Sequence, residues 1–176
     1  MGHPHRHGAE AIKARVALLT VSDSRDPETD TSGQAARARI EKAGHRVVDY
    51  QILPDEPDRV RKQVVDWLSL EDLDAVILNG GTGIAARDRT YEAIASLLGK
   101  KLDGFGELFR MLSFQEIGSA AMISRALGGI ARGKVIFSLP GATVAVELAL
   151  DRLILPELGH LIAELRKGRP DPSASS

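Results

Sequence analysis

Four short apolar segments, each followed directly by a polar or glycine-rich loop, constrain the fold of this chain more than any other feature of its sequence. They are residues 15–22, 46–53, 75–78 and 134–139. Nearly continuous apolar runs of this length are typical of strands that are buried on both faces. Helical patterns follow the loops, and alternating strands and helices predict parallel pairing with right-handed crossovers. We therefore expect a single Rossmann-like α/β domain, a three-layer sandwich around a mainly parallel sheet.

The helical patterns are defined by apolar spacing and by terminal residues. The first helix is expected over residues 33–43, because Gly44 is a favoured residue just after a helix C-terminus. After a turn at 54–57, apolar residues on one face predict a second helix: Val60, Val64, Val65 and Leu68. A further helix begins near Thr90. Two more patterns follow residue 141: Val146, Leu150, Leu153 and Ile154, then Leu158, Leu161, Ile162 and Leu165.

Length, charge and cysteine content exclude several classes of protein. A chain of 176 residues, 43% apolar, can bury the core of one domain without covalent or metal staples. Its 23 basic and 24 acidic residues give a net charge of -1, which provides no overall attraction to nucleic acid or an anionic membrane. With no cysteine there is no disulfide, iron–sulfur cluster or thiolate nucleophile. Without a signal peptide or a membrane-spanning run, we expect a cytoplasmic protein.

The two ends of the chain differ in composition from the rest. Residues 1–13 include histidines at alternate positions interrupted by Pro4 and Gly8, and we predict a flexible N-terminal tail there. Residues 168–176 are rich in proline and serine and predict a disordered C-terminal tail. The folded domain is therefore assigned to residues 14–167.

The loops that follow the four strands are the expected location of the functional site. In parallel α/β folds, ligands bind in the crevice beyond the carboxyl ends of the strands. Here these loops cover residues 23–32, 54–57, 79–89 and 140–143, and they contain small polar and acidic residues together with most glycine-rich turns.

The third of these loops, residues 79–90, is the strongest candidate for binding an anion. Its glycines allow backbone N–H groups to approach a phosphate closely, and Thr82 adds a hydroxyl donor. The helix expected near its end could point its N-terminus at the same anion. A tight structural turn is the alternative interpretation. Asp88 could hold magnesium or pair with a neighbouring arginine, and the loop lacks the Gly-Lys-Ser/Thr of a Walker A motif.

A dinucleotide fingerprint is present in the same loop in a formal sense. Residues 81–86 match the pattern G-x-G-x-x-G/A, which predicts NAD binding when it follows the first strand and precedes an acidic strand end by about 20 residues. Asp103 stands near that distance but in the segment Lys-Lys-Leu-Asp-Gly, outside any apolar run. NAD binding is therefore the less favoured interpretation.

Several of these segments together resemble the molybdopterin-binding proteins of molybdenum cofactor biosynthesis, and in particular their MoaB branch. The matching segments are residues 20–25, 53–56, 80–88, 104–118, 124–126 and 139–145. They occur in the family's order across residues 16–165. The resemblance implies an α/β sandwich assembled as a homotrimer or homohexamer, with a molybdopterin site at the strand ends. In the catalytic branch, magnesium and ATP serve to adenylylate molybdopterin, and other enzymes of the pathway are candidate partners.

The resemblance also implies roles for individual residues. Asp55 and Asp88 match acidic residues implicated in magnesium binding and adenylyl transfer, so they are the candidate catalytic and metal-binding residues. The candidate ligands of molybdopterin or nucleotide match the family's loops; they are Ser22, Asp23, Ser24, Gly80, Gly81, Thr82, Gly83, Arg87, Ser124, Arg125, Pro140 and Gly141.

Two positions depart from the pattern of the catalytic branch. Tyr91 stands where that branch usually has proline, and Thr143 replaces the second proline of its Pro-Gly-x-Pro loop. The second change is typical of the MoaB branch, whose catalytic competence is less uniform. Two functions therefore stay open: a molybdopterin adenylyltransferase using ATP and magnesium, and a non-catalytic molybdopterin-binding or scaffold protein of the same pathway.

A local concentration of large apolar residues stands between the third and fourth strands. It comprises Phe105, Phe109, Met111, Leu112 and Phe114, in a chain with only 4% aromatic residues. Their spacing resembles one face of a helix. Packing in the core and contact between subunits are both compatible with this pattern, and the second would suit a lasting homo-oligomer.

Overall fold

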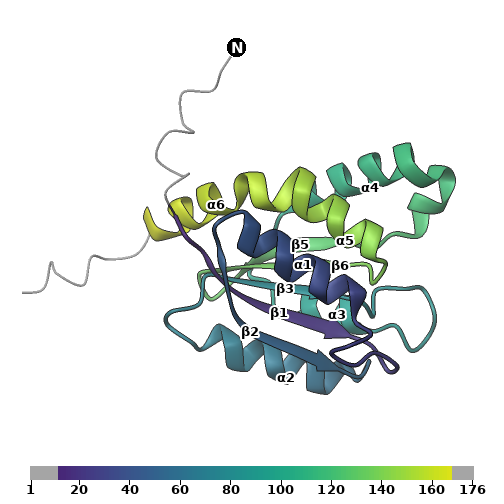
Figure 1. Ribbon diagram of the computed structural model, residues 1–176, viewed down its shortest axis with the longest axis horizontal. Helices are drawn as coiled ribbons and strands as arrows, with labels where there is room; N and C mark the ends of the chain where they lie inside the picture. The colour runs from purple at the N-terminus through teal and green to yellow at the C-terminus, as the bar shows by residue number, and fades with distance from the viewer. Residues whose placement is uncertain (1–11, 168–176) are drawn as a thin grey trace, which may run out of the picture.

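The computed structural model describes residues 12–167, which form one six-stranded sheet with helices on both faces (Figure 1). The tails predicted at 1–13 and 168–176 lie outside the described residues, except for residues 12 and 13. The strands are β1 (Arg15–Val21), β2 (Arg46–Leu53), β3 (Ala75–Asn79), β4 (Lys100–Lys101), β5 (Leu127–Ala131) and β6 (Lys134–Leu139). All four predicted strands are present within one residue of their expected bounds.

The order of strands across the sheet is β2-β1-β3-β6-β5-β4. β2, β1, β3 and β6 are parallel neighbours, and β5 and β4 add an antiparallel edge beside β6. Because the four parallel strands end at the same edge, the loops that follow them must also meet there. The sheet is therefore mainly parallel, as predicted.

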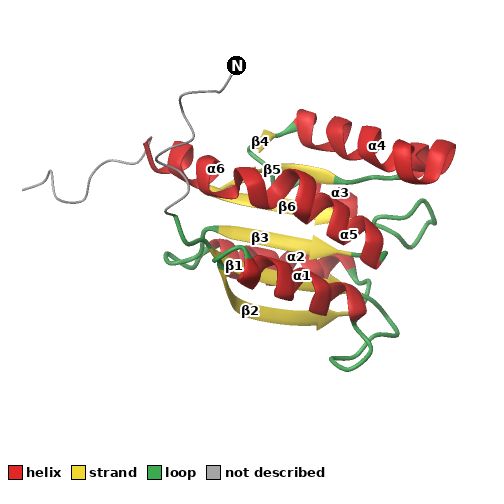
Figure 2. Ribbon diagram, turned by 45° about the horizontal axis from the view of Figure 1, so that its top comes forward, coloured by secondary structure: helices red, strands yellow, loops and turns green. Residues whose placement is uncertain are grey.

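The helices form the two outer layers of the sandwich (Figure 2). Their bounds are α1 (Thr31–Lys42), α2 (Pro57–Leu68), α3 (Thr90–Ala95), α4 (Asp103–Ile117), the 3-10 helix η1 (Gly118–Ile123), α5 (Thr143–Ala149), the π-helical segment η2 (Leu150–Ile154) and α6 (Leu155–Lys167). α1, α4, α5 and α6 pack on one face of the sheet, and α2 and α3 pack on the other. The expected three-layer α/β fold is confirmed.

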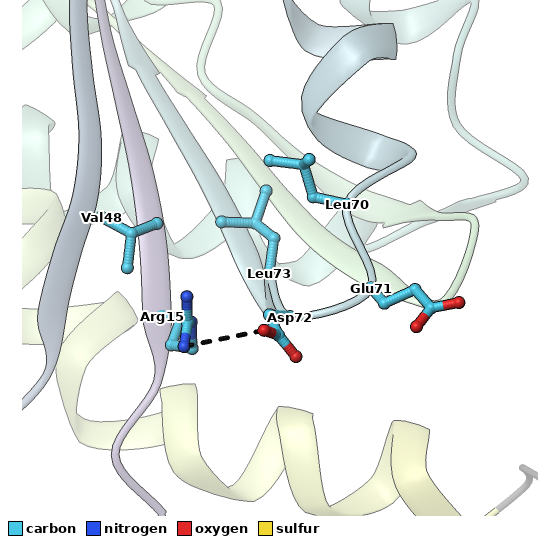
Figure 3. Close-up of a pocket in the computed structure, with 6 residues that line it drawn as sticks. All are labelled: Arg15, Val48, Leu70, Glu71, Asp72 and Leu73. Carbon is cyan, nitrogen blue, oxygen red and sulfur yellow. Dashed lines mark ion pairs between the residues drawn. The ribbon is translucent and has the colours of Figure 1, made fainter.

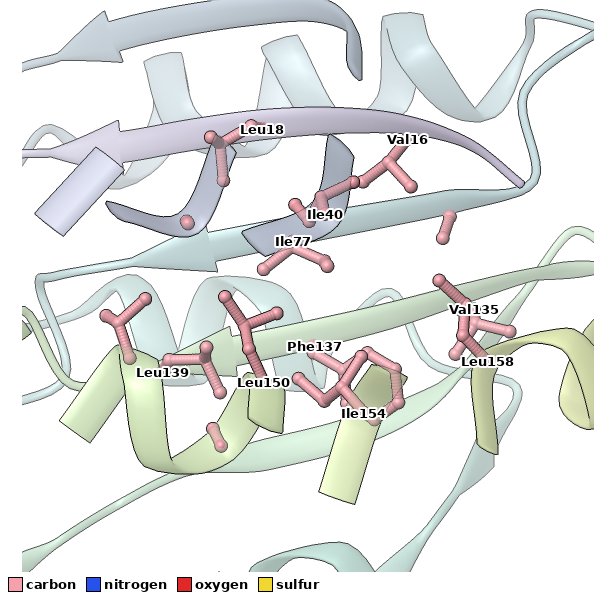
Figure 4. Close-up of a cluster of buried hydrophobic side chains, with 14 of the residues drawn as sticks. Val16, Leu18, Ile40, Ile77, Val135, Phe137, Leu139, Leu150, Ile154 and Leu158 are labelled. Atoms are coloured by element: carbon pink, nitrogen blue, oxygen red, sulfur yellow. The ribbon is translucent and has the colours of Figure 1, made fainter. Parts of the chain in front are cut away.

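Side chains alternate between two cores along each central strand. On β1, Val16 and Leu18 face the layer that contains α1, whereas Ala17 and Leu19 face the layer that contains α2. Figure 4 shows the first core, where Leu18 of β1 and Ile77 of β3 lie beneath Ile40 of α1. Burial on both faces explains why these strands are nearly continuous apolar runs.

β5 does not stand out in the sequence, because Gly128 and Gly129 interrupt its apolar pattern. Both glycines allow close packing: a Cβ at Gly128 would lie 3.0 Å from Phe137 and 3.1 Å from Phe105. β5 then connects to β6 through Arg132 and Gly133, both with positive φ, as in a tight hairpin turn. β5 was therefore not predicted because close packing requires glycine at positions where an apolar side chain would have marked a strand.

α1 begins at Thr31, two residues before the predicted start. The Asp30 carboxylate accepts a hydrogen bond from the N–H of Gly33 (3.0 Å), so Asp30 is the N-cap. The polar loop after β1 is correspondingly shorter than expected. Within residues 12–167, no helix is long and apolar enough to cross a membrane.

The apolar residues between 105 and 114 were expected either to pack in the core or to form a contact between subunits, and the structure divides them into a buried and an exposed set. Phe105, Phe109 and Leu112 are buried in α4 against the sheet, which is core packing. Met111 and Phe114 are more than half exposed on the outer side of the same helix. The stripe is thus wider than one buried face requires.

Substitution of a core leucine provides a test of this packing. Leu18→Ala removes a fully buried side chain between β1 and α1 and should lower the free energy of unfolding by about 2–5 kcal/mol. Leu70→Ala, at a position that is 49% exposed, should cost less than about 1 kcal/mol. Urea unfolding of both variants measures the difference, and equal losses would contradict the assignment of the core.

Candidate functional site

The structure brings the four strand-exit loops together at one edge of the sheet. The N–H of Ser22 donates to the carbonyl of Leu53 (2.8 Å), which joins the loops after β1 and β2. The N–H of Gly80 donates to the carbonyl of Leu139 (3.0 Å), and a Cβ at Gly141 would lie only 3.2 Å from the Gly80 Cα. The loops after β3 and β6 are therefore in backbone contact.

Two glycines give the loop after β3 its path. Gly80 and Gly81 have φ values of +98° and +65°, a region that residues with a side chain rarely adopt. A Cβ at Gly80 would overlap the carbonyl oxygen of Val21, and a Cβ at Gly81 would overlap the side chain of Thr90. Glycine is required at both positions by conformation and by space.

Carbonyl and amide groups of this loop have different partners. The carbonyl of Gly81 accepts from the N–H of Thr90 (3.2 Å), and those of Thr82 and Gly83 accept from Arg125 (3.0 and 2.8 Å). Among the described residues, no acceptor is bound to the N–H groups of residues 81–84. A loop with its carbonyls occupied and consecutive amides unoccupied has the donor arrangement that an anion such as phosphate requires.

Asp88 lies within this loop, and Asp55, from the loop after β2, lies beside it. The Asp55 carboxylate accepts from the Thr90 hydroxyl (3.0 Å), and the Asp88 carboxylate accepts from the N–H of Ala85 (2.9 Å). Burial raises the pKa of Asp55, the Thr90 hydrogen bond partly offsets this, and the negative charge of Asp88 raises it further. The two carboxylates are therefore close enough to repel each other.

This donor set fits magnesium in one particular manner. Within residues 12–167, no group of three or more histidine, aspartate or glutamate side chains is placed to hold a metal ion alone. Magnesium is commonly held by one or two carboxylates, with phosphate oxygens and water completing its shell. Asp55 and Asp88 are suited to that arrangement beside a bound phosphate.

The remaining predicted residues surround the same edge. Asp23 accepts from the N–H of Asp55 (3.0 Å) and forms an exposed ion pair with Arg87. The Ser22 hydroxyl accepts from the N–H groups of Ser24 (3.3 Å) and Arg25 (3.2 Å), which shapes the loop after β1. Ser124 follows η1, and its side chain makes no hydrogen bond to the loops within the described part of the chain.

The opposite edge of the sheet also has a small pocket, but with different chemistry. It is lined by Arg15, Val48, Leu70, Glu71, Asp72 and Leu73 (Figure 3). Arg15 and Asp72 form an exposed ion pair of 3.9 Å across it, a contact of little energetic weight. Arg15 begins β1, whereas Ser22 follows its end, so the pocket is about 20 Å from the loops described above.

Comparison with known proteins identifies the family. A model of the family described as "Probable molybdopterin binding domain" matches residues 17–160. Molybdenum cofactor biosynthesis protein B of Halalkalibacterium halodurans is 51% identical over 170 residues, covering 93% of this chain and 98% of that protein. The chain belongs to the molybdopterin-binding family of molybdenum cofactor biosynthesis. The family resemblance inferred from the sequence segments is confirmed, and with it molybdopterin as the ligand of the domain.

Solved structures of the family have the same fold. A crystal structure of a molybdenum cofactor biosynthesis protein B superposes with a TM-score of 0.87 at 49% identity, covering 89% of this chain and 98% of that one. The tungsten cofactor synthesizing protein MoaB of Pyrococcus furiosus gives a TM-score of 0.78 at 36% identity, over 88% and 98% of the chains.

A buried polar network beside the edge formed by the strand-exit loops was not predicted. The Asp30 side chain, which is fully buried, accepts hydrogen bonds from Tyr50, Ser32 and Arg25 in addition to capping α1. The Ser32 hydroxyl also lies 2.8 Å from the side-chain oxygen of Asn79 at the end of β3, so its single proton is shared between Asp30 and Asn79. An aspartate just before a helical pattern is a common N-cap, so the sequence could have indicated the role of Asp30 at the start of α1. It contains no signal for the contact between Asp30 and Tyr50 of β2.

Arg25 connects this network to the last loop of the site. Its guanidinium donates to Asp30 and Ser32 on one side and to the carbonyl of Gly141 (3.2 Å) on the other. The loops after β1 and β6 are thereby held together across the end of β3. The network thus positions two of the loops that carry predicted site residues.

The charge of Asp30 is stabilised by these donors. Burial alone would raise the pKa of Asp30, but hydrogen bonds from Thr20, Tyr50, the Gly33 N–H and Ser32 outweigh it and hold the pKa below the ordinary 3.8. Burial and the neighbouring carboxylate raise the pKa of Tyr50 to about 12, so the phenol stays a donor at neutral pH.

Asp30→Asn tests the network through stability and its pH dependence. The variant should lower the free energy of unfolding at pH 7 by about 1–3 kcal/mol, because buried donors lose a charged acceptor. Since the folded-state pKa of Asp30 is depressed, its contribution is present above pH 3.8 and is lost as the pH falls through the lower folded-state value. Urea unfolding should show the gap between parent and variant narrowing below that pH.

Asp72→Asn is the matched control, because Asp72 is 83% exposed. Its effect should stay within about 0.5 kcal/mol at every pH. A gap for Asp30→Asn that persists unchanged to the acid limit would contradict the role given to its charge.

Proposed function

We propose that the chain binds molybdopterin at the edge formed by the loops after β1, β2, β3 and β6 and adenylylates its terminal phosphate with ATP and magnesium. The observation that carries this proposal is the row of unoccupied amides at residues 81–84 between Asp55 and Asp88. Amides of this kind suit a phosphate, and the two carboxylates suit the cation that would accompany a triphosphate.

The reaction is a displacement at phosphorus. A phosphate oxygen of molybdopterin forms a bond to the α-phosphorus of ATP, the bond to the bridging oxygen of the β-phosphate breaks, and pyrophosphate leaves. The attacking oxygen is already anionic at neutral pH, so no general base is required. Catalysis then consists of positioning two polyanions and stabilising charge as it shifts.

The residues of the edge divide these tasks. The amides of residues 81–84 and the Thr82 hydroxyl hold and orient phosphate oxygens. Asp55 and Asp88 would hold magnesium, which when bound offsets the repulsion between the reactants. The Arg87 side chain is 65% exposed beside Asp23, where it can approach an incoming phosphate. Arg25, held by Asp30, keeps the loop at Gly141 against the site.

The second candidate function is that of a binding or scaffold protein without turnover. It is favoured by Tyr91 and Thr143, which stand where the catalytic branch usually has proline. The Thr143 hydroxyl lies 3.1 Å from that of Thr31, so it joins the start of α5 to the start of α1. Incubating the protein with molybdopterin, ATP and magnesium and analysing for adenylylated pterin separates the two functions. No product from a protein that binds molybdopterin would leave only the scaffold function.

Substitutions at Asp88 and Gly81 should separate chemistry from binding. Asp88→Asn keeps size but loses the charge that would hold the cation, so turnover should fall at least about a hundredfold, roughly 2.7 kcal/mol, with little change in molybdopterin affinity. Gly81→Val should weaken binding itself, because the added side chain overlaps Thr90 and strains a positive φ. Affinity and adenylylation are measured for both variants.

Gly104→Val is the matched control for the glycine, because a Cβ there meets nothing within 4 Å and φ is not positive. It should bind molybdopterin as the parent does. Equal turnover of the parent and Asp88→Asn would remove Asp88 from the catalytic role.

The outer side of α4 and η1 supports a homotrimer or homohexamer as the working form. We call this surface the α4–η1 face; its residues are each at least 47% exposed, and they are Leu108, Met111, Phe114, Ile117, Met122 and Ile123. A contiguous apolar surface of this kind commonly marks a protein–protein contact. The face continues directly into Ser124 and Arg125, which places such a contact next to the site.

Light scattering at micromolar concentration should therefore give the mass of three or six chains. Phe114→Asp places a charge at the centre of the α4–η1 face and should shift the mass toward that of one chain, 18.9 kDa. Leu70→Asp, at a position that is 49% exposed and lies off this face, should leave the mass unchanged. A parent protein of 18.9 kDa would contradict the proposed assembly.

A further inference from the structure

We propose that Arg125 is a positioning residue that holds the anion-binding loop in shape from behind, and that Tyr91 holds Arg125 in turn. This inference rests on the proposed phosphate site at residues 81–84 and deepens it. It differs from the role implied by the family resemblance, in which Arg125 itself contacts the ligand.

The guanidinium of Arg125 donates its hydrogen bonds to other groups of the protein. Nε donates to the carbonyl of Thr82 (3.0 Å), and Nη2 donates to the carbonyls of Gly83 (2.8 Å) and Asp88 (3.0 Å). Nη1 pairs with the carboxylate of Glu92. Every nitrogen of the group thus has a protein acceptor. Of its five N–H donors, four are directed at these acceptors, which leaves at most one N–H of Nη1 for an anion and so excludes the bidentate contact by which arginine commonly binds phosphate.

The direction of these bonds explains how the loop presents its amides. Three carbonyls from both ends of the loop converge on one planar group. Because a carbonyl shares its peptide plane with the N–H of the next residue, the bonds from Arg125 to the carbonyls of Thr82 and Gly83 orient the N–H groups of Gly83 and Ile84, which have no acceptor in the described chain. The guanidinium therefore fixes the orientation of the peptide planes on which an anion would depend.

Tyr91 and Glu92 keep the guanidinium in place from α3. The Arg125 Cζ atom lies 4.8 Å from the centre of the Tyr91 ring, within the range of a cation–π contact. Glu92 neutralises the positive charge, and its own pKa is lowered, mainly by the hydrogen bond from Arg125. Proline, the usual residue of the catalytic branch at position 91, offers no ring of this kind to the guanidinium.

The Arg125→Lys variant separates the two roles, because lysine keeps the positive charge of Arg125 but loses the planar arrangement of its donors. A lysine ammonium binds phosphate as a point charge, but it cannot bridge three carbonyls in one plane. If Arg125 contacted the anion by charge, Arg125→Lys would preserve most of the affinity. If Arg125 positions the loop, Arg125→Lys should weaken molybdopterin binding at least about tenfold.

A second readout reports the loop directly, without ligand. In Arg125→Lys, hydrogen exchange should be faster at the hydrogen-bonded amides of the loop, with unchanged exchange in β1. These amides belong to Gly80, Ala85, Asp88 and Thr90. Tyr91→Phe keeps the ring and should match the parent in both measurements. Tyr91→Leu removes the ring and should shift both in the same direction as Arg125→Lys, by a smaller amount. Arg166→Lys, at the opposite edge beside Asp74, should change neither.

The outcomes distinguish this inference from the proposed function. Weaker binding together with faster loop exchange in Arg125→Lys supports the positioning role. Parent-like binding by Arg125→Lys overturns it, and so does weaker binding with unchanged exchange, because the loop would then keep its shape without the Arg125 guanidinium. If the parent itself fails to bind molybdopterin, the proposed function fails, while faster loop exchange in Arg125→Lys would still support the positioning of the loop.

Discussion

The backbone of Gly80 leaves β3 with a positive φ in contact with the carbonyl of Val21, and the arrangement of the site depends on this turn. The turn hydrogen-bonds to Leu139 and abuts Gly141, so it also sets the distance between the loops after β3 and β6. A side chain at Gly80 would overlap the carbonyl oxygen of Val21 and force the backbones of these two residues apart. The parallel sheet provides the common edge, and the glycine turn makes that edge narrow enough for backbone amides to take part in binding.

Two arginines complete the edge from opposite sides. Arg25 draws the loop of Gly141 toward the buried carboxylate of Asp30, and Arg125 gathers the carbonyls of the glycine loop. Each is balanced by an acidic partner, so neither adds an uncompensated charge to the protein. The groups left to face a polyanionic ligand are amides, hydroxyls, the exposed Arg87 side chain and a carboxylate pair suited to a cation. Such fixed dipoles need little rearrangement when charge shifts during a phosphoryl displacement.

The parts that could be predicted are those that follow from local patterns. Buried parallel strands require continuous apolar runs, and this rule located β1, β3 and β6. β2, an edge strand with no fully buried residue, was located by its shorter apolar pattern, and the exit loops of all four strands meet at one edge. The family's motifs then pointed to Asp55, Asp88 and the glycine loop. β5 was missed because its glycines at 128 and 129 serve close packing with residues distant in sequence. The start of α1 was misplaced because a side-chain cap at Asp30 decides it.

The features that the sequence did not predict depend on contacts between residues that are far apart in the chain. Nothing in the residues around Tyr50 indicates that its hydroxyl meets Asp30, and nothing near Arg125 indicates that it bonds to a loop 42 residues earlier. Apolar spacing likewise gave one stripe on α4, whereas the sheet covers only part of it and leaves Phe114 outside. These features depend on how elements pack, and a single sequence records them only as residue types.

A crystal structure of the protein with molybdopterin bound would test the central claim most directly. The account predicts a phosphate oxygen within about 2.7–3.2 Å of amide nitrogens among residues 81–84, with Asp55 and Asp88 facing the same phosphate and Arg125 still bonded to the loop carbonyls. A phosphate held by arginine side chains alone, with those amides directed away from it, would contradict the account.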